Sequence, residues 1–313
     1  MPRNWREFAE RRIEEIRRIV GDGRAINALS GGVDSSVVTV LGHRALGRQL
    51  RNIWIDTGVM RENEGPEVVR TFAALGIPVR IVQARALFFS SLKGVTDPER
   101  KRKRFRDTFY KVLGREVRRW QAHYLLQGTI KADIIETKRG VKTQHNILQQ
   151  IGIDPEKGYG FQVIEPIKTL FKHEVRTLGK YLRLPTSIYE RMPFPGPGLA
   201  ARIVGEVTPA RTAVVRKACA IVEEECRQFR PFQAFAVLLS DRATALGPRG
   251  ERVFGQIIAV RCVDSRDAMT ATVTRLPWPV IERIRKRICA EVSGVTKVVL
   301  DVTPKPPSTI EYV

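Results

Sequence analysis

The stretch "NALSGGVDSSVVTV" (residues 27–40) leads from one apolar segment through two glycines into a second apolar segment. This pattern predicts a buried strand, a tight turn and then a helix. Gly31 and Gly32 would let the backbone approach an anion closely, and the free amides and dipole of a helix start favour negative charge. The lysine of the common nucleotide loop, G-x-x-x-x-G-K-S/T, is absent. A lone "SGG" also fits a plain strand-to-helix turn, but the full run "SGGVDSS" favours a phosphate-binding loop.

Two kinds of side chain in this loop predict different tasks. Ser35 and Ser36 place hydroxyl donors in the first helical turn. Asp34 puts a carboxylate beside phosphates, which is unfavourable unless a cation intervenes, so it predicts a magnesium ion that accompanies a nucleotide. The complete predicted phosphate-binding set is Ser30, Gly31, Gly32, Val33, Asp34, Ser35 and Ser36.

Strands and helices alternate through the first part of the chain. An amphipathic helix is predicted at 5–20, and buried strands at 24–29, 51–56, 78–84, 124–128 and 161–167, with helical segments between them. This alternation predicts an α/β fold with a doubly wound parallel sheet.

The stretch "PGPG" (195–198) interrupts this alternation, because it can continue neither a helix nor a strand. We therefore expect a domain boundary near Tyr189, with domains at 1–189 and 190–313. Helices at 209–228 and 278–292 and strands at 233–239, 254–263 and 295–302 predict a small α+β domain in the second part.

The chain is strongly basic, with 54 lysines and arginines, 33 acidic residues and a net charge of +21. Such charge suits a nucleic-acid partner, a solvated arginine-rich surface, or anionic substrates and an anionic partner, and charge alone does not choose between them. The basic segment 97–119 carries aromatic residues that would suit base stacking, but an amphipathic helix with its aromatics in the core is favoured.

Other bulk features narrow the class of protein. No apolar stretch approaches the roughly 18 residues of a membrane span, and no apolar signal core opens the chain, so we expect a cytoplasmic protein without membrane contact. Cys219, Cys226, Cys262 and Cys289 lie far apart without a C-x-x-C pair, which argues against zinc or a disulfide scaffold.

The loop motif resembles that of a known group. "SGGVDS" (30–35) is similar to the pyrophosphate loop of the N-type ATP pyrophosphatases, which have a Rossmann-like sheet. Six further stretches resemble, in the same order, the synthetase part of the GMP synthetases. They are "WIDTGVMRENE" (54–64), "QGTIKADIIE" (127–136), "VKTQHN" (141–146), "EPIKTLFKHEVRTLG" (165–179), "PFPGPGLAARIVGEV" (193–207) and "KPPSTIEYV" (305–313).

This resemblance implies a reaction. The C2 oxygen of XMP would attack the α-phosphate of ATP, giving adenylated XMP and pyrophosphate. Ammonia would then attack C2, and GMP and AMP would leave. The protein would act by positioning and charge neutralisation rather than as a nucleophile.

The resemblance also implies residue roles. Asp133, Glu136, Lys142 and His145 match a mobile lid and, with Asp34, form the implied catalytic set. Lys142 would offset charge on the transferring phosphoryl group, and His145 either contacts the nucleotide or only caps the lid. Gln144 departs from the family, which usually has a second histidine at that position. Met192, directly before "PFPGPG", departs as well, because a histidine commonly stands there.

A second implied set would bind XMP: Arg61, Arg202, Lys305, Ile310 and Glu311. Arg61 resembles an arginine that reaches XMP from the other subunit of a homodimer, although a solvated arginine is the commoner fate. Asp56, at the end of a predicted strand, lies where nucleotide-binding sheets place their ligands, and a helix cap is an equally good interpretation.

The four cysteines lie outside any G-x-C-x-G elbow on which a glutaminase nucleophile would sit. The resemblance therefore implies a separate glutamine amidotransferase subunit as the source of ammonia. Within the fold, tRNA-modifying pyrophosphatases and NAD synthetase are disfavoured by "PFPGPGL" and "KPPSTIE". A basic nucleic-acid-binding module without activity is the alternative from another class.

Overall fold

The computed structural model describes residues 3–138, 161–247, 249–266 and 268–313, and these residues form two compact units. Unit 1 comprises Met1–Asp56, Asn63–Ala84 and Asp107–Arg191, and unit 2 comprises Thr57–Glu62, Arg85–Arg106 and Met192–Val313. The expected domain limit near Tyr189 stays a prediction.

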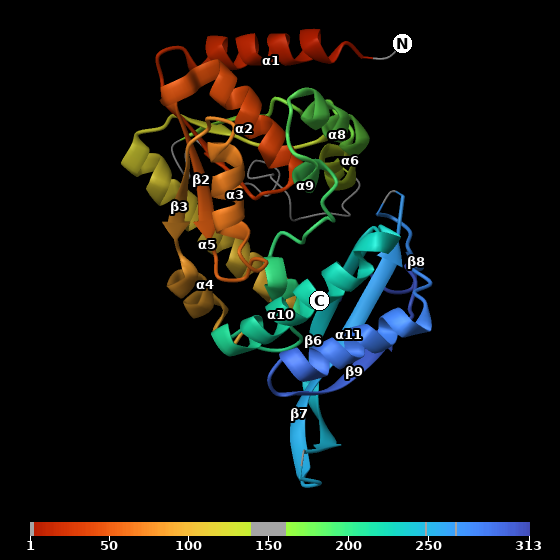
Figure 1. Cartoon of the computed structure of the whole chain (residues 1–313). Coiled ribbons are helices and arrows are strands. Elements are labelled where there is room, and N and C mark those ends of the chain that lie inside the picture. The colour runs from red at the N-terminus through yellow and green to blue at the C-terminus, as the bar shows by residue number, and fades with distance from the viewer. Residues whose placement is uncertain (1–2, 139–160, 248, 267) are drawn as a thin grey trace. The chain divides into compact units, whose positions relative to one another are not determined.

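Unit 1 is built on a parallel sheet of five strands in the order β3-β2-β1-β4-β5 (Figure 1). The strands are β1 (Ala25–Ala28), β2 (Leu50–Asp56), β3 (Val79–Gln83), β4 (Tyr124–Leu126) and β5 (Gln162–Ile164). All neighbouring pairs are parallel, so the predicted doubly wound α/β fold is confirmed.

Unit 1 contains one helix before its first strand and further helices after most strands. They are α1 (Trp5–Val20), α2 (Val33–Leu46), α3 (Glu64–Ala73), α6 (Lys131–Lys138), α8 (Lys172–Tyr181) and α9 (Thr186–Tyr189), with a short 3-10 turn η1 (Gly47–Gln49). α4 (Arg85–Leu92) belongs to unit 2, and α5 (Pro98–Trp120) runs through residues of both units. α2 is apolar on nearly every side, as its buried valines require, and it packs against α1, α8 and the sheet.

The strand order places the loop after β1 at a special position. β1 lies between β2 and β4, so the chain leaves β1 toward one side of the sheet and later returns on the other. Ligands of open α/β sheets bind at the carboxyl end of the strands at this point of reversal. The loop of residues 29–32, which joins β1 to α2, lies there.

Unit 2 contains a mixed sheet of four strands, β6 (Gln233–Leu246), β7 (Arg252–Asp264), β8 (Thr272–Val273) and β9 (Val295–Asp301). β7 pairs antiparallel with β6 and β8 and parallel with β9. Besides α4 and the start of α5, its helical elements are α10 (Pro209–Cys226), α11 (Trp278–Glu291) and the turns η2 (Gly198–Arg202) and η3 (Arg227–Phe229). α10 packs on β6 and α11 on β9, which confirms the predicted small α+β domain.

Two groups of side chains in unit 2 bear on expectations from the sequence. Ile284 and Ile288 of α11 are buried. None of the four cysteines forms a disulfide; Cys219, Cys226 and Cys262 are buried and Cys289 is exposed. Over the described residues, no helix is both long and apolar enough to cross a membrane.

Candidate active site

Hydrogen bonds of its own serines fix the conformation of the loop between β1 and α2. The Ser30 and Ser35 hydroxyl oxygens lie 2.9 Å apart, Ser35 Oγ donates to the Gly32 carbonyl at 3.1 Å, and the Gly32 amide donates to Ser30 Oγ at 3.3 Å. Gly32 caps α2 without a side-chain hydrogen bond. The first amides of a helix have no partner inside the helix, so those of α2 remain available to an anion.

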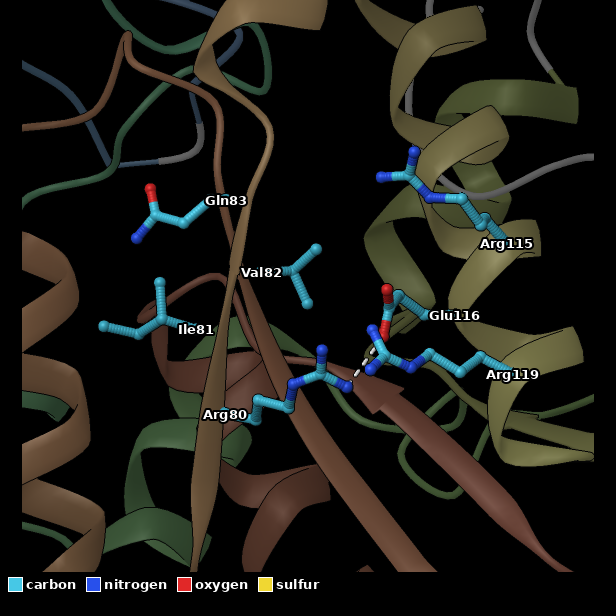
Figure 2. A pocket seen from close by; sticks show the side chains of 7 residues that line it. All are labelled: Arg80, Ile81, Val82, Gln83, Arg115, Glu116 and Arg119. Atoms are coloured by element: carbon cyan, nitrogen blue, oxygen red, sulfur yellow. Dashed lines mark hydrogen bonds and ion pairs between the residues drawn. The ribbon is translucent and has the colours of Figure 1, made fainter.

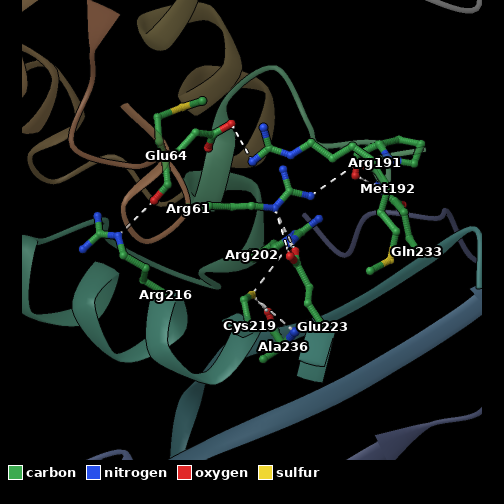
Figure 3. A network of polar contacts seen from close by, with 12 residues as sticks. Arg61, Glu64, Arg191, Met192, Arg202, Arg216, Cys219, Glu223, Gln233 and Ala236 are labelled. Carbon is green, nitrogen blue, oxygen red and sulfur yellow. Dashed lines mark hydrogen bonds and ion pairs between the residues drawn. The ribbon is translucent and has the colours of Figure 1, made fainter. Parts of the chain in front are cut away.

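Gly31 shows why the loop needs a glycine. Its backbone angle φ is +81°, a region that side-chain-bearing residues rarely occupy. A Cβ atom there would also lie 3.1 Å from the Arg191 guanidinium and 3.2 Å from the Glu64 carboxylate. Arg191 donates to the Gly31 carbonyl at 3.3 Å and pairs with the buried Glu64 at 2.9 Å, as Figure 3 shows for that pair. Arg191 thus fixes the position of Gly31 through the carbonyl of that residue.

Asp34 carries the negative charge of the loop, and a lysine from α8 forms an ion pair with it. Lys172 Nζ lies 2.6 Å from Asp34 Oδ2. Among the described residues, Asp34 Oδ1 and Ser36 Oγ are buried without a hydrogen-bond partner. An unsatisfied buried acceptor is costly, so two of them at one helix start mark a place where a ligand would supply the missing contacts.

The loop after β4 lies against the same helix start. A Cβ atom at Gly128 would lie 3.1 Å from the Asp34 and Ser35 backbones, so a side chain there would require these backbones to shift by a few tenths of an ångström. Next to it, the Asp133 carboxylate accepts the Ile130 amide at 3.0 Å and caps α6. The loops after β1 and β4 therefore meet at the start of α2 in unit 1.

The other implied lid residues lie outside the part of the chain that the structure describes. Lys142, Gln144 and His145 belong to the undescribed stretch 139–160, and the side chain of Glu136 is likewise outside the described atoms. Their implied catalytic roles stay predictions. Asp56 is buried at the carboxyl end of β2, as predicted.

In unit 2, Arg202 and Glu311 are joined directly. Arg202 Nε and Nη2 each lie 3.1 Å from a Glu311 oxygen, and Arg202 is buried. Burial lowers the pKa of Arg202, but the charge of Glu311 and its hydrogen bonds outweigh burial and raise it overall. Gln233 Nε2 donates to the same carboxylate at 2.9 Å. The guanidinium is thus already occupied by a carboxylate, and the contact of Arg202 with XMP that the resemblance implies stays a prediction.

Arg61 belongs to the same network within unit 2. Its Nε contacts both carboxylate oxygens of Glu223 at 2.9 and 3.1 Å, and its Nη2 donates to the Met192 carbonyl (Figure 3). The guanidinium also lies 4.1 Å from the Phe194 ring centre, and the Arg202 guanidinium lies 4.9 Å from that ring centre. In this structure Arg61 thus makes intrachain contacts, and its implied reach into a second subunit stays a prediction.

The C-terminal segment is docked in unit 2 rather than frayed. The Lys305 backbone pairs with Ala271, and Lys305 Nζ donates to the Ala268 carbonyl at 2.8 Å. Ile310 is buried beside Val263 and Ala271. The segment therefore brings Lys305, Ile310 and Glu311 to fixed places.

One buried arginine anchors this segment and was not predicted. Arg261, fully buried in β7, donates to the carbonyls of Thr303, Thr309 and Ile310 at 2.7 to 2.9 Å and to Asp301 Oδ2 at 2.7 Å. A single arginine within the apolar run "QIIAVRCV" was the available signal. Lys172, Arg191 and Glu64 were also missed, although Lys172 and Glu64 lie inside quoted motifs.

The carboxylate of Asp34 fits a cation that accompanies a nucleotide. Within the described part of the chain, no three histidine, cysteine or carboxylate side chains gather as a metal site. Magnesium commonly takes one or two carboxylates and otherwise water and substrate phosphates. Asp34, with its unsatisfied oxygen, fits that requirement.

The chain is similar to known proteins over nearly its whole length. The family model described as the GMP synthase C terminal domain matches residues 221–312. A protein of Archaeoglobus fulgidus, named as one subunit of GMP synthase (glutamine-hydrolyzing), is 50% identical over 307 residues, which cover 98% of each chain. The proteins of the same name from Methanopyrus kandleri and Pyrococcus abyssi are 49% and 48% identical, over 98% and 99% of each chain. A solved NH3-dependent NAD synthetase from Campylobacter jejuni, in complex with the nitrate ion, is more distant, at 18% identity and a TM-score of 0.48, covering 63% of this chain and 81% of that one.

Proposed function

The chain belongs to the family of the glutamine-hydrolyzing GMP synthase subunit whose members it matches over nearly its whole length. From this premise we propose that it converts XMP to GMP with ATP and ammonia. The observation that carries the proposal is the start of α2, where phosphate-binding amides, unsatisfied polar atoms and the Asp34–Lys172 pair meet. The sheet places this group where open α/β folds bind nucleotides.

The residues of unit 1 would bind the part of ATP that leaves. Helix amides and serine hydroxyls contact the β- and γ-phosphates, and Gly31 lets the backbone approach them. Lys172 and Arg191 add positive charge beside the loop, a task that the lysine of the common nucleotide loop would otherwise perform. Stabilising the pyrophosphate makes it a better leaving group when the XMP oxygen attacks the α-phosphate.

Asp34 would hold the magnesium ion that accompanies ATP, which supplies charge neutralisation between the phosphates. The unsatisfied Oδ1 of Asp34 supports this assignment. Since Lys172 already contacts the other carboxylate oxygen, both charges of the loop remain balanced when no nucleotide is bound.

The residues of unit 2 would recognise XMP. Glu311 accepts ribose hydroxyls, Lys305 and Ile310 provide a cation and an apolar surface, and Arg202 orients Glu311. The support is geometric, because Arg202 is buried and bonded to Glu311 while Arg261 holds the segment that carries both Ile310 and Glu311. Arg61 and Phe194 complete the same network.

Two further parts of the proposal concern assembly. A separate glutaminase subunit supplies the ammonia, in keeping with the words "glutamine-hydrolyzing" and "subunit" in the names of the relatives. A second copy of this chain covers the end of β9 and the residue after it in unit 2, where Val299, Leu300 and Val302 are 39%, 36% and 66% exposed. Exposed apolar residues grouped in this way mark association surfaces.

The deciding experiment incubates the purified chain with XMP, ATP, magnesium and either ammonium chloride or glutamine. GMP, AMP and pyrophosphate should form in equal amounts with ammonium, and glutamine alone should give no GMP. ADP and orthophosphate as products would refute the proposed chemistry. GMP from glutamine alone would refute the need for a second subunit.

A further inference from the structure

A groove in unit 1 is lined by residues none of which belongs to the proposed site. It has a volume of about 480 Å³ and is lined by Arg80, Ile81, Val82, Gln83, Arg115, Glu116 and Arg119. Four of these residues are consecutive in β3 and three come from α5. Figure 2 shows Arg80 and Val82 directed toward α5, and Ile81 and Gln83 directed to the other side of β3. Because residues of both faces line it, the groove follows the outer edge of the strand.

That edge is open to a further strand. β3 is the last strand of the sheet, and among the described strands it pairs only with β2. An edge strand presents backbone amides and carbonyls without a partner, which an extended chain can bind by adding one more strand. Ile81 and Val82 add apolar contact along the same groove.

The groove carries excess positive charge. Three arginines face one carboxylate, and that carboxylate, the buried Glu116, is already paired with Arg80 at 3.1 Å. Among the described residues, Arg115 and Arg119 form no ion pair, and both are exposed. Nearby, Arg51 lies 3.6 Å from the Trp120 ring centre. Burial lowers the pKa of Arg51, and repulsion by Arg80 and Arg119 lowers it further.

We propose that this groove binds an extended acidic segment of the glutaminase subunit as an added strand beside β3. The proposal rests on the proposed function, which requires that subunit. The open edge would bind the backbone of the segment, and Arg115 and Arg119 would bind its carboxylates. A small free anion would use the arginines alone and leave the strand edge and the apolar lining without a role.

The first test measures the dissociation constant between the full chain and its glutaminase subunit. The double variant Arg115→Glu/Arg119→Glu should bind about tenfold more weakly or worse, which corresponds to about 1.4 kcal/mol. Arg118→Glu is the matched control, because Arg118 is exposed on the same helix but does not line the groove. It should change the constant less than about twofold, as expected of an isolated surface charge. Equal weakening by both variants would indicate a general charge effect and overturn the proposal.

The second test examines the strand edge itself. Amide hydrogen exchange of residues 79–83 should slow when the glutaminase binds, because an added strand protects the edge amides. Unchanged exchange there, with binding intact, would overturn the proposal. So would loss of RNA binding in the double variant while glutaminase binding stays normal, because the groove would then be a nucleic-acid site.

Ammonia-dependent GMP formation separates the groove proposal from the proposed function. The groove variants should retain this activity, because none of the changed residues belongs to the proposed site. If the wild-type chain lacks the activity, the proposed function fails, and with it the reason to expect a glutaminase subunit as the partner. If the activity is present and the groove variants bind glutaminase normally, only the groove proposal fails.

Discussion

Arg202 and Glu311 form a two-contact ion pair across 109 residues of sequence, with both nitrogen–oxygen distances at 3.1 Å. The guanidinium is 1% exposed, so its charge depends on this carboxylate. The pair joins the "PFPGPGLAAR" stretch to the C-terminal segment. A substitution of Arg202 or Glu311 should therefore affect both segments that the pair joins.

Replacing Glu311 by glutamine tests this pair. The change keeps the shape but removes the charge that compensates Arg202, and we expect a loss of about 2 kcal/mol in the free energy of unfolding. The Michaelis constant for XMP should rise at the same time. Chemical denaturation and steady-state kinetics measure the two effects. Glu291→Gln, in an exposed pair with Arg287, is the control and should leave the denaturation midpoint unchanged.

Replacing Asp34 by asparagine tests the loop. We expect the rate of pyrophosphate release to fall about 100-fold, since one preorganised charge contact at the transferring group is worth about that much. Circular dichroism should show an unchanged fold. Asp22→Asn, at an exposed position just before β1, is the control. Pyrophosphate release at the wild-type rate would contradict the assignment of the loop.

Replacing Lys172 by alanine tests the cation that faces Asp34. We expect pyrophosphate release to slow about tenfold and magnesium dependence to change, because the phosphate group loses a positive neighbour. The effect should be non-additive with Asp34→Asn, as residues in contact usually are. Lys168→Ala, exposed just before α8, is the control. Strict additivity in the double variant would show that the pair has no shared role.

Replacing Lys305 by alanine tests the docked segment. The Michaelis constant for XMP should rise about tenfold, and the constant for ATP much less, because the lysine belongs to the XMP set. Lys286→Ala on the exposed side of α11 serves for comparison. The opposite ranking of the two constants would count against the assignment.

Lys101 predicts a pH effect. It is 2% exposed, donates to the Ile203 carbonyl at 2.6 Å, and burial, with repulsion by Arg211, lowers its pKa to about 8 from 10.5. Between these values the unfolded chain binds the proton and the folded chain does not, so the free energy of unfolding rises with pH there. Relative to Lys101→Met, the wild type should gain about 1 kcal/mol from pH 7 to pH 9.

Denaturation curves at several pH values, compared between wild type and variant, measure this gain. Lys103→Met is the matched control, because Lys103 is exposed on the same helix. A difference between wild type and Lys101→Met that stays constant over this pH range would show that Lys101 keeps its proton in the folded chain.

Local pattern was enough to predict the sheet and its loop. Apolar runs of five to seven residues between helical segments predicted five strands, and "SGGVDSS" placed the turn after the first. The order of the strands was not predicted, because no local signal says which strand returns beside β1.

Residues that reach a site from a distant segment escaped prediction. Lys172 meets Asp34 across 138 residues, and Arg191 meets Gly31 across 160, so neither contact leaves a trace in local spacing. The bond between Arg202 and Glu311 was also unforeseen, although resemblance had named both residues. Resemblance assigns roles to positions, but only the fold shows which positions compensate one another.

The division of the chain has a consequence for how such a protein can be inherited. Its backbone passes between the two units five times, after Asp56, Glu62, Ala84, Arg106 and Arg191. No single genetic crossover would transfer one whole unit without part of the other, because every cut divides at least one unit. A single crossover therefore cannot exchange either unit alone as a ready-made module.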